Sequence, residues 1–293
     1  MSVVFRITIP EQDHTEMVIN ILQQQLPGAT VVIDHNGGEL LLRIEHVSAD
    51  PGAITILLET LGVSSEMLPA EPDKSRSNSA EDMRSFWSKA FKGHQTMWGF
   101  EPSRSAILAK DLLLAEGVKE VLIPGIGYGR NARVFLDDGI SVTGIEIAQE
   151  AIDIARKHYG TELNIFQGSV TDMPFDQHLY QAIFCYGLVY LLNMEQRRKL
   201  IADCYRQLLL GGWMIFSVVS KKSPNYGKGK PLAKDTFEIN KDGGQIFFYD
   251  KDSAQLEFGA YGIKDCFEIE EQVHPGTGTA SFIFLQVVCR KEV

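Results

Sequence analysis

Three glycines at alternate positions, Gly125, Gly127 and Gly129, form the stretch of this sequence best suited to binding a ligand. They follow an apolar run at 121–123, typical of a buried strand, and precede apolar residues at helical spacing in 132–136. A strand, a glycine-rich turn and a helix open a βαβ unit that holds an adenosine-type cofactor. Glycine is needed there because a side chain would block the ligand or forbid the turn. The free N–H groups at the start of the helix face the ligand.

The spacing of these glycines differs from that of two common nucleotide-binding motifs. In the dinucleotide fingerprint G-x-G-x-x-G, the third glycine stands where this chain has Arg130. A P-loop is excluded, because no Gly-Lys-Ser/Thr follows the glycines. The spacing therefore argues against a nicotinamide-dependent oxidoreductase, which stays a third alternative.

Polar residues follow each of the next three predicted strands. Glu146 ends a strand at 141–145, where a carboxylate can accept hydrogen bonds from both ribose hydroxyls. The segment 167–175 follows the third strand and can place a polar side chain and a backbone N–H against an adenine edge. The segment 185–192 follows the fourth strand.

The elements that must position these residues alternate between strand and helix. This alternation predicts a parallel sheet covered by helices on both faces. The expected strands are 121–123, 141–145, 163–166, 181–186, 213–219, 266–270 and 281–290, with a short extra strand at 245–249. The expected helices are 148–159, 195–210 and 253–261. Gly211 and Gly212 are expected to terminate the helix at 195–210.

Aromatic residues precede the glycine loop, between Met83 and Phe100. Two interpretations compete, one in which the aromatic helix packs on the domain and one in which it forms a lid over the cofactor pocket. For Trp98 and Phe100, which flank a glycine outside a clear helical period, the two interpretations are about equally favoured.

Together, the glycine loop and the three strand-end segments resemble the class I S-adenosylmethionine-dependent methyltransferases, from about Trp98 to the C-terminus. The resemblance implies a Rossmann-like, doubly wound sheet of seven strands with an antiparallel final hairpin. It also implies S-adenosyl-L-methionine as cofactor, S-adenosyl-L-homocysteine as product and a small molecule as methyl acceptor. The segments 98–103 and 127–131 look most like the thiopurine and tellurite-resistance branch. The alternative is a cofactor-binding pseudo-enzyme or a partner-binding protein on this fold.

The resemblance implies a role for each segment. The glycine loop takes the methionine part, Glu146 the ribose, and Ser169 with Val170 the adenine, whereas Tyr186 lines the methyl-transfer face. Tyr190 is a second candidate on the acceptor side, and no catalytic base and no metal ligand are assigned. The complete set of expected cofactor contacts is Trp98, Gly125, Gly127, Gly129, Arg130, Asn131, Glu146, Ile147, Gly168, Ser169, Val170 and Tyr186.

Three positions depart from the pattern of that family. Pro124 stands where an acidic residue often precedes the glycine loop, and Gln181 stands where an aspartate is common near the start of strand four. Ser169 takes the place of the usual adenine-binding aspartate, so it can act there only as a neutral hydrogen-bond partner.

Residues 1–68 predict a separate ferredoxin-like unit of the order βαββαβ, with a hairpin turn at 36–38. The order and the turn at 26–29 resemble the small heavy-metal-associated domains. That family binds metal through a cysteine pair, which the loop at 10–15 lacks. The histidines of this unit, His14, His35 and His46, have no ligand spacing. We expect a packing role, or contact with a protein partner or a second copy of the chain.

The segment 69–82 is polar and rich in proline and serine, and it predicts a linker between domains 1–68 and 83–293. A basic insertion at 221–234 is a candidate mobile loop. Its lysines and Tyr226 would favour a polar or anionic acceptor if it closed over the site, although a solvated loop is the favoured interpretation.

The composition is that of a globular protein of 293 residues, with 44% hydrophobic and 23% charged residues. A net charge of -10 argues against nucleic acid as a partner. Four scattered cysteines indicate reduced thiols rather than a disulfide framework. No apolar run approaches the roughly 20 residues of a membrane span, and the N-terminus does not resemble a signal peptide. We therefore expect a cytoplasmic protein.

Overall fold

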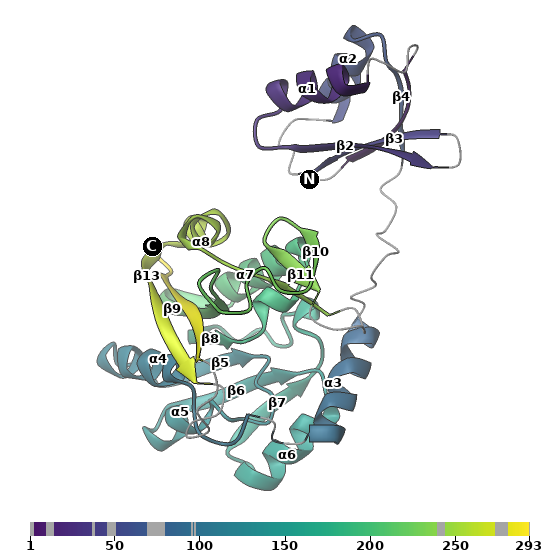
Figure 1. Cartoon of the computed structure of the whole chain (residues 1–293). Helices are drawn as coiled ribbons and strands as arrows, with labels where there is room; N and C mark the ends of the chain where they lie inside the picture. The colour runs from purple at the N-terminus through teal and green to yellow at the C-terminus, as the bar shows by residue number, and fades with distance from the viewer. Residues whose placement is uncertain are drawn as a thin grey trace. The chain divides into compact units, whose positions relative to one another are not determined.

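The computed structural model describes residues 3–9, 15–36, 39–45, 51–68, 80–94, 96, 98–238, 244–272 and 281–292. The chain divides into two compact units, Met1–Ser77 and Asn78–Val293 (Figure 1). Several predicted features lie outside the described residues: residues 10–14 of the predicted loop at 10–15, the hairpin glycines Gly37 and Gly38, His46, residues 69–79 and the side chain of His35.

The first unit is a four-stranded antiparallel sheet with two helices, and its strand order is β2-β3-β1-β4. In β1, every second residue is buried, because successive side chains of a strand point to opposite faces. Phe5, Leu22 and Leu42 are among the side chains that form its core. The elements are β1 (Val3–Thr8), α1 (Thr15–Gln25), β2 (Thr30–Asn36), β3 (Glu39–Glu45), α2 (Pro51–Thr60) and β4 (Ser64–Leu68).

The second unit contains a seven-stranded sheet of the order β13-β14-β9-β8-β5-β6-β7. The five strands from β9 to β7 are parallel, and β14 is antiparallel to both β9 and β13. The predicted Rossmann-like sheet with an antiparallel final hairpin is therefore confirmed. The strands are β5 (Glu120–Pro124), β6 (Ser141–Glu146), β7 (Leu163–Gln167), β8 (Tyr180–Tyr186), β9 (Leu208–Val219), β13 (Ile263–Gln272) and β14 (Ser281–Arg290).

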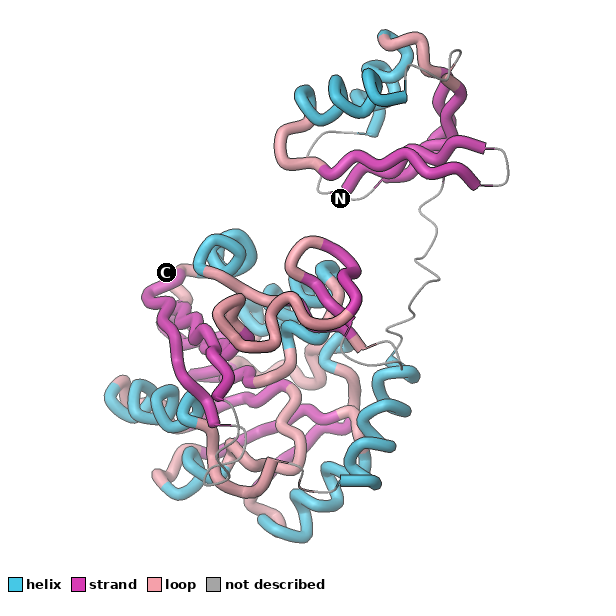
Figure 2. The backbone as a smooth tube through the Cα atoms, in the orientation of Figure 1, coloured by secondary structure: helices cyan, strands magenta, loops and turns pink. Residues whose placement is uncertain are grey.

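Helices cover both faces of this sheet, and Figure 2 shows the strands between them. Val121 and Ile123 pack on one face with α4, α5 and α6, whereas Leu122 packs on the other face with α7 and α8. Strand alternation thus supplies both cores, as a doubly wound sheet requires. The helices are α3 (Ala80–His94), α4 (Arg104–Ala115), α5 (Arg133–Asp137), α6 (Gln149–Tyr159), α7 (Met194–Arg206) and α8 (Lys251–Phe258).

The predicted end of the helix at 195–210 is wrong. Helix α7 ends at Arg206, and β9 begins at Leu208, so Gly211 and Gly212 lie inside a strand. A Cβ on Gly212 would lie 2.8 Å from the carbonyl oxygen of Leu209, which shows how closely the backbone approaches itself there. The glycines therefore serve a close backbone approach at the start of a strand rather than a helix end.

The basic insertion is also more ordered than a mobile loop. It contains β10 (Lys230–Ala233), which pairs with β11 (Thr236–Glu238), and β11 pairs with β12 (Gln245–Phe247). The ammonium of Lys221 lies 2.7 Å from a carboxylate oxygen of Asp235 and 2.6 Å from one of Asp250. These ion pairs fasten the start of the insertion to the domain.

Candidate active site

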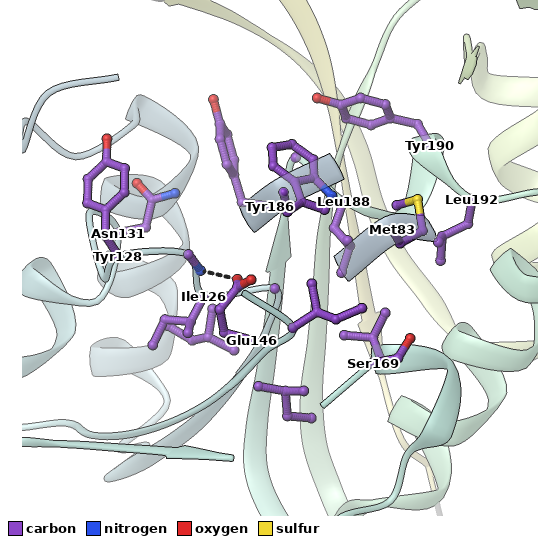
Figure 3. Close-up of a pocket in the computed structure, with 18 of the residues that line it drawn as sticks. Met83, Ile126, Tyr128, Asn131, Glu146, Ser169, Tyr186, Leu188, Tyr190 and Leu192 are labelled. Carbon is purple, nitrogen blue, oxygen red and sulfur yellow. Dashed lines mark hydrogen bonds between the residues drawn. The ribbon is translucent and has the colours of Figure 1, made fainter. Parts of the chain in front are cut away.

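A cavity of about 330 Å³ lies beyond the carboxyl ends of β5, β6 and β8 (Figure 3). Its place in the sheet follows from the strand order. The chain runs from β5 to β6 on one side, and β8 lies on the other side of β5, so the order reverses between β5 and β8. Ligands of open α/β sheets bind at such a reversal, outside the carboxyl ends of the strands.

Two of the three loop glycines line this cavity. Gly125 and Gly127 have φ of +69° and +58°, a backbone conformation that other residues rarely adopt. A Cβ on Gly125 would lie 2.8 Å from Leu188 Cδ2, whereas a Cβ on Gly127 would have only Phe91 within 4.0 Å. The glycines thus keep the backbone of the loop open to the cavity.

Gly129 does not line the cavity, unlike the other predicted contacts of the loop. It faces α6 and β7, where a Cβ would lie 2.7 Å from Tyr159 Cε2 and 3.0 Å from Leu163 Cδ1. The hydroxyl of Tyr159 donates a hydrogen bond of 2.9 Å to the carbonyl oxygen of Gly129. The third glycine therefore serves helix packing, which its spacing alone does not reveal.

Glu146 stands on the cavity wall at the end of β6, with 5% of its surface exposed. Its Oε2 accepts a hydrogen bond of 2.9 Å from the Gly127 N–H (Figure 3). Its Oε1 accepts one of 2.8 Å from the Ala148 N–H. Burial raises the pKa of Glu146, and these backbone bonds oppose that rise. The carboxylate is therefore oriented by the glycine loop, with acceptor capacity left for a ligand.

The segment 98–103, which precedes α4, is tied to the glycine loop by side chains of that loop. The backbone N–H of Trp98 donates to Tyr128 Oη at 3.2 Å, and this hydroxyl donates to the carbonyl oxygen of Gly99 at 2.7 Å. The rings of Trp98 and Tyr128 are stacked, with centroids 6.4 Å apart. Tyr128 thereby holds the start of the segment beside the cavity.

Arg130 and Asn131 hold the rest of the same segment. Arg130 Nε donates to the carbonyl oxygen of Glu101 at 2.5 Å, and Asn131 Oδ1 accepts from the Ser103 N–H at 2.9 Å. Both side chains also line the cavity, as does Trp98. The segment 98–103 and the loop residues 127–131 are therefore connected by hydrogen bonds.

The aromatic helix α3 packs on the second unit and also lines the cavity. Phe91 is buried against Tyr128, Ala148 and Ala151, and it lines the cavity together with Trp87 and Met83. Phe100 differs, because it does not line the cavity. It is 37% exposed, and its ring stacks on that of His158, with centroids 4.1 Å apart. The predicted lid role thus fits α3 and Trp98 but not Phe100.

The predicted adenine side, at the end of β7, also reaches the cavity. Gly168, Ser169 and Val170 line it, and Ile147 lines it from the end of β6. Ser169 is buried and starts the short 3₁₀ helix Val170–Asp172, and its hydroxyl lies 2.7 Å from that of Thr171. A neutral hydroxyl pair, rather than a carboxylate, therefore faces this part of the site.

Tyr186 and Tyr190 line the opposite side, together with three residues that the sequence pattern did not indicate: Glu271, Phe282 and Phe284. The rings of Tyr186 and Phe284 are parallel within 7°, with centroids 5.4 Å apart. Burial raises the pKa of both tyrosines, so their hydroxyls stay protonated at neutral pH. The three additional residues belong to the C-terminal hairpin β13–β14, which adds a wall to the cavity.

Glu271 is a buried carboxylate that connects this hairpin to α4. It accepts hydrogen bonds from the Arg104 N–H at 3.0 Å, the Ser105 N–H at 2.8 Å and the Ser105 hydroxyl at 2.5 Å. These donors belong to the first turn of α4, whose N–H groups have no partner within the helix. A signal was present in the sequence, because Glu271 follows the apolar Ile269 at strand spacing and so shares its buried face.

Other candidate chemistry is not found in the described parts of the chain. There, no cluster of three or more His, Cys, Asp or Glu side chains is placed to hold a metal ion. The described helices include none with the length and apolar character needed to cross a membrane. Lysines of the basic insertion are absent from the cavity lining that the structure describes.

Comparison with known proteins finds relatives of the domain that carries this cavity. Residues 121–212 match the family model of a methyltransferase domain. The ubiquinone biosynthesis O-methyltransferase of Nitrosospira multiformis is 27% identical over 112 residues, which are 37% of this chain and 46% of that protein. Its counterpart from Vibrio vulnificus is 27% identical over 153 residues, which are 50% of this chain and 63% of that protein. The match thus spans about half to two thirds of these relatives.

Solved structures share the architecture of the second unit. The 1,6-didemethyltoxoflavin-N1-methyltransferase of Burkholderia thailandensis, solved with S-adenosylhomocysteine, has a TM-score of 0.56 at 16% identity, covering 78% of this chain and 93% of that one. The magnesium protoporphyrin IX methyltransferase of Synechocystis PCC 6803, solved with bound S-adenosylmethionine, has a TM-score of 0.53 at 12% identity, covering 74% and 99%. The second unit has the class I methyltransferase fold. The cavity of the second unit lies where its strand order reverses, with Glu146 on the wall.

Proposed function

We propose that this chain transfers a methyl group from S-adenosyl-L-methionine to a small-molecule acceptor. The observation that carries the proposal is the pairing of Glu146 with the Gly127 N–H at the edge of the cavity, at 2.9 Å. It joins the strand-end acid to the glycine loop within the matched methyltransferase domain, residues 121–212. The cavity volume, about 330 Å³, lies within the range of roughly 300–1,000 Å³ typical of small-molecule sites.

The residues present fit that cofactor. Positive φ at Gly125 and Gly127 leaves backbone rather than side chain facing the methionine part. Glu146 has lone pairs left to accept hydrogen bonds from ribose hydroxyls, and the Ser169–Thr171 pair offers hydroxyls to the adenine. Trp98, Arg130, Asn131, Ile147, Gly168 and Val170 complete the proposed contact set from the cavity wall.

The bound cofactor supplies a methyl group already activated by its positive sulfur. What remains for the protein is to align the acceptor and to exclude water, and alignment contributes on the order of 7–11 kcal/mol in favourable systems. The aromatic side chains of α3 and of the C-terminal hairpin provide an apolar wall for this purpose. Tyr186 and Tyr190 carry protonated hydroxyls, so they hold and orient an acceptor rather than remove its proton.

The relatives support an acceptor of low molecular weight and not a particular acceptor atom. One is named for transfer to oxygen in ubiquinone biosynthesis and another for transfer to N1 of a didemethyltoxoflavin. The similarity of 98–103 and 127–131 to the thiopurine and tellurite-resistance branch supports the same broad class. We therefore place the chain among small-molecule methyltransferases.

Calorimetric titration with S-adenosylhomocysteine tests the proposal, with NADH as a comparison ligand. We expect saturable binding of S-adenosylhomocysteine only, and a loss of affinity of at least about tenfold in Glu146→Ala, because hydrogen bonds to a charged group contribute about 1.5–3 kcal/mol. Glu162→Ala, at an exposed glutamate of the same unit, is the matched control. Folded protein that binds neither S-adenosylmethionine nor S-adenosylhomocysteine would refute the proposal. Cofactor binding without turnover of any acceptor would instead favour a pseudo-enzyme.

A further inference from the structure

The acceptor side of the cavity is walled by aromatic rings from three separate elements. Tyr186 ends β8, Tyr190 lies in the short 3₁₀ helix Val189–Leu191, and Phe284 lies in β14. Phe284 lies parallel to Tyr186 and edge-on to Tyr190, whose ring centroid is 6.1 Å away at 69°. Such a wall presents flat ring faces and edges, which pair favourably with a further aromatic ring.

Tyr190 contributes a hydroxyl that the protein itself does not use. Within the described residues, its Oη forms no hydrogen bond, although the side chain lines the cavity. Figure 3 shows this hydroxyl directed toward the Tyr186 side of the cavity. Burial raises the pKa of Tyr190, so the group remains a hydrogen-bond donor at neutral pH. The hydroxyl is open to the cavity and is therefore available to donate a hydrogen bond to a bound molecule.

Glu271 and Arg130 are the charged groups of the cavity lining that act on Tyr186, and the effect of Glu271 is the larger. Glu271 lines the wall beside Tyr186. Burial is the main cause of the raised pKa of Tyr186. The charge of Glu271 raises this pKa further, and the charge of Arg130 lowers it by less. Lys221 pairs with Asp235 and Asp250, Lys222 pairs with Glu268, and the described lining of the cavity contains no lysine of the insertion. A partly desolvated carboxylate repels an anionic acceptor, so the wall favours an uncharged one.

We infer that the methyl acceptor is an uncharged aromatic molecule whose ring packs on Phe284 and whose heteroatom accepts a hydrogen bond from Tyr190. This inference rests on the proposed function and names the substrate class of the same site. It replaces the polar or anionic acceptor that the basic insertion at 221–234 suggested.

Four probes that differ in one property each can test the inference on the full chain saturated with S-adenosylhomocysteine. Anisole is uncharged, aromatic and able to accept a hydrogen bond. Ethylbenzene lacks the acceptor oxygen, cyclohexyl methyl ether lacks the aromatic ring, and 4-methoxybenzoate adds a negative charge. Ligand-observed NMR titration gives a dissociation constant for each probe, and none of them requires turnover.

We expect anisole to bind at least about fivefold more tightly than each of the other three probes. Tyr190→Phe should reduce the affinity for anisole to that for ethylbenzene, a change of about two- to tenfold for one neutral hydrogen bond, and should leave ethylbenzene unchanged. Phe284→Leu should weaken both probes. Tyr226→Phe, at an exposed tyrosine bonded to Asp235, is the matched control and should change neither.

The inference is overturned if 4-methoxybenzoate or cyclohexyl methyl ether binds as tightly as anisole, if Tyr190→Phe weakens anisole and ethylbenzene equally or not at all, or if no probe binds. In each of these cases S-adenosylhomocysteine still binds, so the proposed function survives. Failure of S-adenosylhomocysteine itself to bind would remove both the proposed function and this inference.

Discussion

Asn131 Oδ1 accepts a hydrogen bond of 2.9 Å from the backbone N–H of Ser103. Ser103 is in turn the N-cap of α4, where its hydroxyl accepts from the Ala106 N–H at 3.1 Å. One amide side chain therefore connects the glycine loop to the start of α4. This connection makes the cofactor loop and the segment that precedes α4 depend on each other.

Asn131→Ala should weaken both folding and cofactor binding. It leaves the N–H of Ser103 without its partner in a buried setting, which costs about 1–3 kcal/mol of the free energy of unfolding. We expect a lower urea midpoint and a weaker affinity for S-adenosylhomocysteine, measured by calorimetry. Asn225→Ala, in the exposed part of the insertion, is the control and should leave both quantities unchanged. Equal values for the two variants would show that the connection has no energetic role.

Gly127→Ala should reduce cofactor affinity by at least about tenfold. The new methyl group sits on a residue with φ of +58° beside the cavity, where backbone rather than side chain is expected to face the ligand. Gly139→Ala is a close match, because Gly139 has φ of +76° and open space but lies outside the cavity lining. Both variants should lose about 1–2 kcal/mol of stability from the left-handed backbone. Only Gly127→Ala should also lose binding of S-adenosylhomocysteine.

Gly129→Ala should act on stability first. Its Cβ would lie 2.7 Å from Tyr159 and 3.0 Å from Leu163, and its φ is +84°. Crowding in a packed interior typically costs about 1–3 kcal/mol, to which the backbone strain adds. The expected result is a larger fall in the urea midpoint than in Gly139→Ala. A stability equal to that of Gly139→Ala would contradict the packing role assigned to Gly129.

Glu271→Gln should destabilise the unit although it preserves size. The carboxylate accepts three hydrogen bonds at the first turn of α4, and an amide replaces one of its acceptor oxygens by a donor. We expect a loss of about 1–3 kcal/mol in the free energy of unfolding, measured with urea. Glu270→Gln changes the exposed neighbour on the opposite face of β13 and should be nearly neutral. A neutral Glu271→Gln would show that these bonds contribute little.

The lowered pKa of Glu150 predicts that the contact between α6 and α3 depends on pH. Hydrogen bonding from Ser88 and the ammonium of Lys92 lower the pKa of Glu150 from 4.5 to about 2. A carboxyl group with a lower pKa in the folded state adds stability above pH 4.5, and this contribution disappears as the pH falls toward 2. The effect should be at most about 1 kcal/mol, because Lys92 is largely exposed.

Urea unfolding at pH 7, 5 and 3 measures this contribution. The native chain should lose more stability between pH 5 and pH 3 than Glu150→Gln, whose side chain does not titrate. Glu162→Gln, at an exposed glutamate, should follow the native chain. A parallel loss in Glu150→Gln and the native chain would exclude the predicted role of Glu150.

Local spacing was sufficient for the strands of the sheet and for the residues that line one side of the cavity. The apolar run at 121–123 and the acid Glu146 predicted two strands of a parallel sheet, and both strands are present and adjacent. These features are local because an apolar run indicates a buried strand and because a glycine turn needs only its own backbone freedom. Local spacing predicted the wrong end for the helix at 195–210. Gly212 is needed there because the backbone approaches itself closely, and not because a helix ends.

The sequence by itself thus determined the fold class, the order of the strands along the chain and the backbone of the glycine loop. Only the tertiary structure decided what encloses the loop. Glu271 and Ser105 are 166 positions apart, yet they share a hydrogen bond because β14 lies beside β9 and carries β13 with it. Phe284 of β14 stacks on Tyr186 of β8 because only β9 lies between these two strands. Periodicity reports which face of a strand is buried, whereas the order of strands in the sheet decides which distant residues that face meets.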